Sequence, residues 1–255
     1  MRPRLSRLAV LLDVDGTLAP VREHWDEAEV PPATREIIGR LAERAGLVAL
    51  VSGRPLTDLE RMTGRADLPA AGNHGLELRR PGEEGAPLPE VAAHLGALAD
   101  LMARWRGEFA AAGIGIEDKG ATVSFHYRTA DDPPAAAELL MGPVAADARA
   151  AGLRTTPGRK ILEIRPPVEA DKGTAVHALL AGRDDLDVAI FIGDDVTDAD
   201  GWRALSELVA AGRLQRGIAV LACSAETPDG LAERADLVVD GTSGAAAALE
   251  ALVAD

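Results

Sequence analysis

The segment LLDVDGTL at residues 11–18 ends an apolar run with two carboxylates, Asp13 and Asp15, that are one residue apart. On a strand, residues two positions apart project to the same side, so the two acids are expected to be neighbours where the backbone leaves a sheet. Like charges held this close raise one pKa and require a cation or a proton nearby. This is the arrangement that a nucleophile and a general acid need.

Three further segments place polar residues where a strand ends or a helix begins. The triplet SGR at 52–54 follows the apolar run LVALV, DKG at 171–173 begins a predicted helix, and the acidic GDDVTD at 193–198 ends the strand predicted for VAIFIG. Ligands of open parallel sheets collect at the carboxyl ends of the strands. The four segments are therefore expected to meet at one edge of a sheet.

Each segment also has an ordinary structural interpretation. The aspartates could form a solvated turn, Ser52 or Thr17 could cap a helix, Lys172 could be a surface lysine, and the acids of GDDVTD suit a helix N-terminus. The convergence of all four segments favours a functional site instead. Carboxylates suit Mg²⁺, and a hydroxyl with an ammonium group suits phosphate oxygens.

The elements that must position these residues alternate along both ends of the chain. The first part predicts a strand at LAVLLDV, a helix over Thr34–Ala45, a strand at LVALVS and a helix after Pro55. The last part predicts a helix from Lys172, the strand VAIFIG, a helix over Asp198–Ala211, the strands GIAVLA and ADLVV, and an Ala-rich helix. Strands that are apolar on both faces and joined by helices predict an α/β fold, with a Rossmann-like three-layer parallel sheet core built from residues 1–80 and 168–255.

Residues 81–167 follow a different pattern. A helix over Pro89–Ala112, paired strands at GIGIEDKG and ATVSFHYR, a helix after Pro134 and strands around LRTT and RKILEIR predict an inserted α+β domain. Alternation places Glu117 and Lys119 on one strand face. The two could bind a ligand or form a simple cross-strand or solvated pair, and His126 could be a satisfied structural histidine.

Composition narrows the class of protein. The chain has 255 residues, 47% of them hydrophobic, and a formal net charge of −14, which argues against nucleic acid and anionic membranes as partners. The single cysteine, Cys223, excludes an intrachain disulfide, is expected to be buried, and favours a reducing, cytoplasmic location. Asp13 interrupts the apolar N-terminal stretch too early for a signal peptide or a membrane span.

The four segments resemble, in order, the motifs of haloacid-dehalogenase-like phosphatases. The resemblance implies that Asp13 attacks phosphorus to form an aspartyl-phosphate and that Asp15 protonates the leaving sugar oxygen. It implies a Mg²⁺ ion held by the Asp13 carboxylate, the Asp15 carbonyl and Asp194. It places Asp195 and Asp198 in or beside the metal shell, without deciding which touches the ion. It assigns phosphate binding to Gly16, Thr17, Ser52, Gly53, Arg54 and Lys172.

A narrower resemblance extends over nearly the whole chain. The segments VSGRPL, AGNHGLELR, IEDKGATVSFHYR and RKILEIRP resemble the trehalose-6-phosphate phosphatase family, in which the insert is a cap that binds the disaccharide. The resemblance implies that sugar or phosphate contacts come from Glu117, Lys119, Arg128 and Glu163, with Asn73, His74 and Gly75 lining the core side. Either Arg159 or Lys160 would approach the phosphate.

The sequence therefore predicts a Mg²⁺-dependent phosphatase of trehalose 6-phosphate, with functional coupling to a trehalose-6-phosphate synthase left open. One alternative is a phosphatase of another glycosyl phosphate, such as glucosylglycerol phosphate or mannosylglycerate phosphate. A second is a non-catalytic sugar-phosphate sensor or a receiver-like domain. Asp15 weighs against the sensor, because binding alone does not require a second acid beside the first.

Overall fold

The computed structural model describes residues 5–22 and 27–254, which divide into two units. The core unit comprises the chain up to Ala86 and from Ala170 onward, and the inserted unit comprises Pro87–Glu169. The first boundary lies six residues beyond the predicted one at 80/81. The reason is that β5 (Ala86–Pro87), which pairs with β4 (Glu77–Arg79), extends the large sheet past the expected end of the core.

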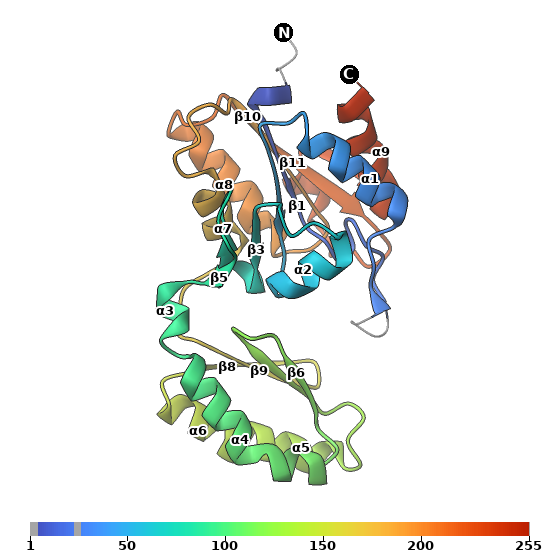
Figure 1. Cartoon of the computed structure of the whole chain (residues 1–255). Helices are drawn as coiled ribbons and strands as arrows, with labels where there is room; N and C mark the ends of the chain where they lie inside the picture. The colour runs from blue at the N-terminus through green and yellow to red at the C-terminus, as the bar shows by residue number, and fades with distance from the viewer. Residues whose placement is uncertain (1–4, 23–26, 255) are drawn as a thin grey trace. The chain divides into compact units, whose positions relative to one another are not determined.

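The core unit contains an eight-stranded sheet in the order β12-β11-β10-β1-β2-β3-β4-β5 (Figure 1). Its remaining strands are β1 (Leu8–Leu12), β2 (Leu47–Val51), β3 (Ala70–Gly72), β10 (Val188–Gly193), β11 (Arg216–Cys223) and β12 (Leu237–Asp240). The pairs from β12 through to β3 are parallel, as predicted, whereas β4 runs antiparallel to β3. β1 lies between β2 and β10, so the strands from the two ends of the chain meet at the centre.

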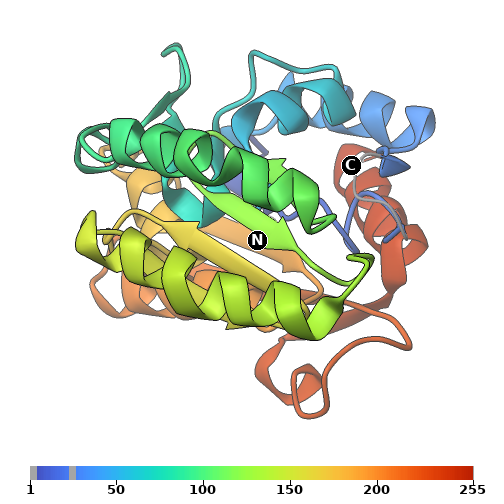
Figure 2. The same ribbon diagram turned by 90° about the horizontal axis from the view of Figure 1, so that it is seen from below.

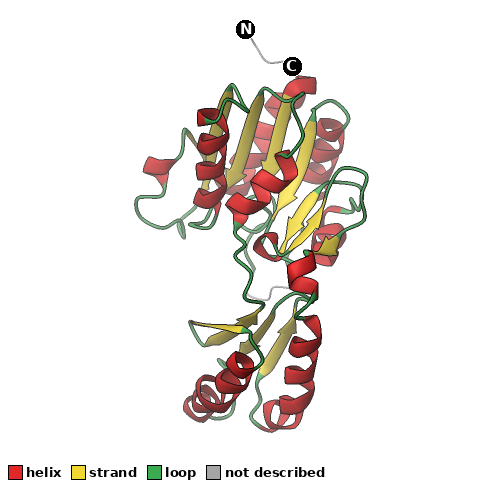
Figure 3. Cartoon of the chain, turned by 90° about the vertical axis from the view of Figure 1, so that its left-hand side faces the viewer, coloured by secondary structure: helices red, strands yellow, loops and turns green. Residues whose placement is uncertain are grey.

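Helices cover both faces of this sheet (Figure 3). They are α1 (Pro32–Ala42), α2 (Leu56–Thr63), α7 (Lys172–Leu180), α8 (Asp198–Ala210) and α9 (Gly241–Ala254), with short 3₁₀ turns at Leu5–Arg7, Asn73–Gly75 and Ala232–Arg234. One face of β1 packs with α1, α2 and α9 through Val10, Ile38 and Leu249. α7 and α8 contact each other, and α8 contacts β10 and β11. The three-layer α/β core is therefore confirmed.

The inserted unit is an α+β module in which helices cover one face of a four-stranded antiparallel sheet (Figure 2). Its elements are α3 (Pro89–Ala92), α4 (Leu95–Ala111), β6 (Gly115–Asp118), β7 (Val123–His126), α5 (Pro133–Leu139), a π-helical turn (Leu140–Val144), α6 (Ala145–Ala150), β8 (Arg154–Gly158) and β9 (Ile161–Arg165). Phe109 of α4 packs on Phe125 of β7, with ring centroids 4.6 Å apart. These rings belong to the core of the unit.

Some predicted boundaries differ from the structure. The single helix expected over Pro89–Ala112 is two helices, α3 and α4. The helix after Pro134 continues through a π-helical turn at Pro143, whose ring cannot donate a helical hydrogen bond. Cys223 was expected in the core but is half-buried, because it ends β11 at the edge of the apolar layer. Among the helices of the described residues, none combines the length and the apolar character needed to cross a bilayer.

A helical glycine in the core unit tests this packing. A Cβ atom on Gly201 of α8 would lie 2.6 Å from the ring of Phe191, which is fully buried in β10. We expect Gly201→Ala to lower the free energy of unfolding by about 1–2 kcal/mol, because overpacking outweighs the gain in helix propensity. Gly107→Ala is the control: this exposed site of α4 has open space, so the free energy should rise by about 0.5–1 kcal/mol. Urea unfolding followed by circular dichroism measures both, and equal shifts would contradict the packing described.

Candidate functional site

A buried lysine joins two of the candidate aspartates. Asp13 directly follows β1, and its backbone N–H donates to the carbonyl of Ile192 on β10 at 2.9 Å. Lys172 begins α7, and its Nζ atom donates to Asp13 Oδ1 at 2.7 Å and to Asp198 Oδ1 at 2.6 Å. Its side chain is only 4% exposed, so the surface-lysine interpretation is wrong. A buried ammonium group needs such partners.

The N-terminal cap of α7 fixes the position of Lys172. Asp171 caps α7: its Oδ1 accepts from the backbone N–H of Thr174 at 2.7 Å, and Thr174 Oγ1 accepts from the Asp171 backbone N–H at 3.0 Å. This reciprocal capping box sets the first turn of the helix. Lys172 follows the cap as the first residue of α7. Its side chain therefore reaches Asp13 at the carboxyl end of β1.

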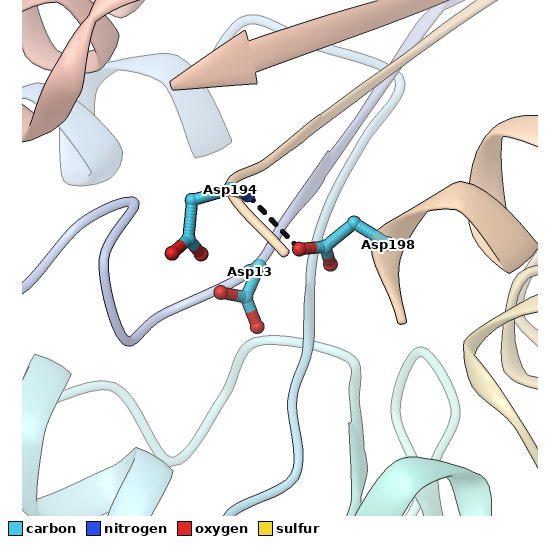
Figure 4. Close-up of side chains that lie close together, drawn as sticks. All are labelled: Asp13, Asp194 and Asp198. Atoms are coloured by element: carbon cyan, nitrogen blue, oxygen red, sulfur yellow. Dashed lines mark hydrogen bonds between the residues drawn. The ribbon is translucent and has the colours of Figure 1, made fainter. Parts of the chain in front are cut away.

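Carboxylate oxygens of Asp13, Asp194 and Asp198 lie within 4.8 Å of one another (Figure 4). Asp194 follows β10 and Asp198 begins α8, so the cluster draws on three elements. Both oxygens of Asp198 already accept hydrogen bonds, Oδ1 from Lys172 and Oδ2 from the backbone N–H groups of Asp194 and Asp195 at 2.9 Å. Asp198 thus shapes the loop, which leaves Asp13 and Asp194 as the better cation ligands. Asp195 is exposed, and its carboxylate is not part of the cluster.

Burial and mutual repulsion control the charges in this cluster. Burial raises the pKa of Asp13 well above its ordinary value, against the opposing effect of Lys172. Burial, together with the charge of Asp198, raises the pKa of Asp194 to about 6. Burial disfavours the charged form of Lys172, but Asp13 and Asp198 outweigh it and raise the pKa of the ammonium group. Three carboxylates against one ammonium group leave an excess of negative charge, which a divalent cation would neutralise.

The turn after Asp13 brings the backbone close to Asp194. Gly16 has φ +75°, and a Cβ atom there would lie 2.0 Å from Asp194 Oδ2, so only glycine fits. Thr17 is fully buried and donates from Oγ1 to Asp194 Oδ1 at 3.2 Å. This hydrogen bond holds the carboxylate of a candidate metal ligand. The phosphate-binding role expected for Thr17 stays a prediction.

The SGR segment forms the loop between β2 and α2. Ser52 is 1% exposed, and its Oγ accepts from the backbone N–H of Arg54 at 3.3 Å. The N-cap of α2 is Pro55, so Ser52 does not cap this helix. A Cβ atom on Gly53 would lie 2.5 Å from Nε2 of His74, which shows how closely the turn at Asn73–Gly75 approaches the loop.

Arg54 binds the second acid of the DVDGT segment. Its Nε donates to Asp15 Oδ2 at 2.6 Å and a terminal nitrogen donates to Asp15 Oδ1 at 2.7 Å, while Asp58 of α2 lies 3.5 Å away. Such paired bonds hold a carboxylate in one orientation. Arg54 was predicted to bind phosphate, and its pairing with Asp15 was missed because two residues 39 positions apart in the chain give no local signal of contact.

The AGNHG segment supports the SGR loop through its backbone. Asn73 and His74 both have positive φ, 49° and 54°, and Gly75 follows at 94°. The backbone N–H of His74 donates to the Ser52 carbonyl at 2.9 Å, and that of Asn73 donates to the Arg54 carbonyl at 2.8 Å. A positive φ strains the backbone of a residue other than glycine, and such strain is concentrated at functional sites.

The inserted unit carries the remaining sequence candidates. Glu117 Oε2 lies 3.6 Å from Lys119 Nζ and 3.0 Å from His126 Nε2, so the three residues form one polar cluster. Register places Glu117 opposite Ser124 and Ser124 opposite Glu163, on the sheet face opposite the buried Phe125. Arg128 is exposed in the turn after β7 and lies outside these strands.

Parallel strands with carboxylates, a lysine and a hydroxyl at their carboxyl ends define a haloacid-dehalogenase-like α/β core. The sequence model of the trehalose-phosphatase family matches residues 11–239. The chain belongs to this family.

Relatives and solved structures agree with this assignment. A probable trehalose-phosphate phosphatase of Sinorhizobium fredii is 38% identical over 216 residues, which cover 80% of this chain and 76% of that protein. A trehalose-phosphate phosphatase of Mycolicibacterium paratuberculosis is 36% identical over 207 residues, covering 77% of this chain. The chain spans about half the length of that mycobacterial relative, of which the match covers 51%.

Two solved structures share the fold. A trehalose-6-phosphate phosphatase related protein superposes with a TM-score of 0.76 at 22% identity, covering 96% of this chain and 97% of that one. The C-terminal domain of the C. albicans trehalose-6-phosphate phosphatase superposes with a TM-score of 0.71 at 22% identity, covering 98% and 93%.

The carboxylate cluster predicts that two neighbouring acids, Asp194 and Asp195, contribute differently to Mg²⁺ binding. We expect Asp194→Asn to weaken Mg²⁺ binding at least about tenfold, because a neutral amide replaces a carboxylate ligand of the cluster. Asp195→Asn is the matched control and should bind Mg²⁺ as the wild type does, since its carboxylate lies outside the cluster. Isothermal titration calorimetry with MgCl₂ gives both affinities. A larger loss in the Asp195 variant would show that the cluster is assigned to the wrong aspartate.

Proposed function

We propose that the protein is a Mg²⁺-dependent phosphatase that hydrolyses trehalose 6-phosphate to trehalose and inorganic phosphate. The observation that carries this proposal is the buried Asp13 carboxylate, which Lys172 binds at 2.7 Å and which shares a cluster with Asp194. A trehalose-6-phosphate synthase would supply the substrate, which is the functional coupling left open by the sequence. The cytoplasmic location stays a prediction.

Mg²⁺ fits the donor set, because hard cations prefer carboxylate oxygens and the cluster carries excess negative charge. Asp13 and Asp194 would hold the ion, with the Asp15 carbonyl as the third ligand implied by the resemblance. When bound, Mg²⁺ supplies positive charge beside the transferring phosphoryl group. Lys172 supplies a positive charge in direct contact with the cluster, and it would reduce repulsion between Asp13 and the phosphate.

The first chemical step uses the two acids of the DVDGT segment. An oxygen of Asp13 forms a bond to phosphorus while the bond from phosphorus to the sugar oxygen breaks. Asp15 enters this step protonated, with one of its oxygens released from Arg54, and gives that proton to the departing sugar oxygen. Asp13 now carries the phosphoryl group. Lys172 occupies Oδ1 of Asp13, which leaves Oδ2 to make the new bond.

The second step restores both acids. Asp15, now a carboxylate, accepts a proton from a water molecule whose oxygen bonds to phosphorus. The bond between Asp13 and phosphorus breaks, which releases inorganic phosphate and returns the Asp13 carboxylate. Through its two hydrogen bonds, Arg54 positions Asp15 for these proton transfers. Ser52 would contact the phosphoryl oxygens from the loop that carries Arg54.

The inserted unit supplies the residues that we propose for sugar recognition. Glu117, Lys119 and Glu163 present carboxylate and ammonium groups on or beside one sheet face, and such groups accept from and donate to sugar hydroxyls. His126 is hydrogen-bonded to Glu117 and helps to orient it. We retain Arg128 as a substrate contact on the resemblance alone.

Phosphate release from a panel of sugar phosphates tests the proposed substrate. We expect kcat/KM for trehalose 6-phosphate to exceed that for glucose 6-phosphate, glucosylglycerol phosphate and mannosylglycerate phosphate by about tenfold or more, because the family resemblance assigns the recognition residues of the inserted unit to the disaccharide. Asp13→Asn is the control and should show no turnover, since it removes the nucleophile without changing its volume. Equal rates on trehalose 6-phosphate and glucose 6-phosphate would refute the substrate, and an active Asp13→Asn variant would refute the mechanism.

Arg54→Lys tests whether Arg54 acts through Asp15 or on the phosphate. A lysine cannot make both bonds to the Asp15 carboxylate, so we expect kcat for trehalose 6-phosphate to fall about tenfold to hundredfold with KM little changed. The loss should be smaller for p-nitrophenyl phosphate, whose leaving group needs no proton. Arg61→Lys, at an exposed arginine of α2, is the matched control. A rise in KM with unchanged kcat would instead indicate direct phosphate binding.

A further inference from the structure

Glu77 is a buried carboxylate that the proposed chemistry does not use. It begins β4 and is 9% exposed, and its Oε2 accepts from the backbone N–H of Leu56, the first residue of α2, at 2.9 Å. Burial raises the pKa of Glu77, and hydrogen bonds from the Leu56 backbone and the Asn73 side chain oppose that shift. Burying a carboxyl group costs free energy unless hydrogen bonds within the protein replace its contacts with water.

The backbone opposite Glu77 leaves room for its carboxylate. Gly72 is the register partner of Glu77 across the β3–β4 hairpin. A Cβ atom on Gly72 would lie 2.8 Å from Glu77 Oε2, and 2.9 Å from both the Arg54 carbonyl oxygen and the Leu56 nitrogen. The hairpin and the loop between β2 and α2 are therefore in direct contact, with no space for a side chain between them.

The hairpin holds this loop at three alternate residues. The Ser52 carbonyl accepts from the His74 N–H, the Arg54 carbonyl accepts from the Asn73 N–H, and the Leu56 N–H donates to Glu77. The first two contacts are between backbone groups, so almost any sequence could make them. The third depends on a side chain. Without it, the N–H that begins α2 would be buried with no acceptor.

The same turn also contacts the start of α7. A Cβ atom on Gly75 would lie 3.0 Å from the carbonyl oxygen of Asp171, the residue before Lys172. A displacement of the hairpin would therefore be transmitted both to the loop that carries Arg54 and to the helix that carries Lys172.

We propose that Glu77 is a positioning residue: by accepting from the Leu56 N–H, it holds the loop of Ser52–Arg54 in the geometry that binds phosphate. The inference rests on the proposed function only in assigning that loop to phosphate.

Inorganic phosphate in the presence of Mg²⁺ is the probe, and calorimetry gives its dissociation constant. We expect Glu77→Leu to raise this constant about tenfold, because the Leu56 N–H loses its acceptor and the loop relaxes. Glu77→Gln keeps an acceptor oxygen and should stay within about twofold of the wild type. Glu60→Gln is the matched control, since the Glu60 carboxylate pairs with Arg79 of the same hairpin and not with the Leu56 N–H. The affinity for Mg²⁺ alone should be unchanged in every variant.

If Glu77 had a purely structural role, Glu77→Leu would reduce the folded fraction, but the folded protein would bind phosphate with unchanged affinity. Glu77→Gln would then have no phosphate affinity to restore. If Glu77→Leu does not fold, Glu77→Asp decides, because it keeps the charge but is one methylene too short to reach Leu56. A folded Leu or Asp variant with wild-type phosphate affinity overturns the proposal.

A second measurement separates this inference from the proposed function. If the wild type neither binds phosphate nor hydrolyses any sugar phosphate, the proposed function fails. The position of the loop is then measured by amide hydrogen exchange, which should accelerate at residues 52–56 in Glu77→Leu but not in Glu60→Gln. Unchanged exchange overturns the role of Glu77 independently of any activity.

Discussion

The site depends on one buried ammonium group between two carboxylates. Lys172 contacts Asp13 and Asp198 at 2.7 and 2.6 Å in an environment that excludes water, and Asp194 adds a third carboxylate nearby. One positive charge cannot balance three negative ones. Burial, with the added repulsion between the carboxylates, raises the pKa values of Asp13 and Asp194. The remaining negative charge creates the demand for a cation. The same imbalance makes the cluster suited to chemistry on an anionic group, provided that a metal ion is present.

The parallel sheet explains why these residues meet. β1 lies between β2 and β10, so the segments that follow the three strands emerge at the same edge. Each segment then needs its own local support. Asp198 accepts from the backbone of the loop after β10, Thr17 bonds Asp194, and the β3–β4 hairpin carries the loop after β2. Side chains that are not expected to contact the substrate thus hold in place the side chains that are.

The sequence was informative where local pattern decides structure. The apolar strands, the helices between them and the α+β insert were predicted in the right order, because burial on both faces and helical periodicity are properties of short segments. The convergence of DVDGT, SGR and GDDVTD was expected because ligands collect at the carboxyl ends of parallel strands, and that of DKG because it begins a helix. The first domain boundary differs because β5 extends the sheet by pairing with β4, which its own residues do not signal.

The sequence by itself determined which residue types stand at the carboxyl ends of the strands, and hence the class of chemistry. Only the tertiary structure decided how those residues are paired. Arg54 pairs with Asp15, both oxygens of Asp198 accept hydrogen bonds from Lys172 and the loop backbone, and Glu77 accepts from the first N–H of α2. These pairings join residues that are far apart in the chain, and they depend on side-chain direction and burial, which exist only after the strands have packed.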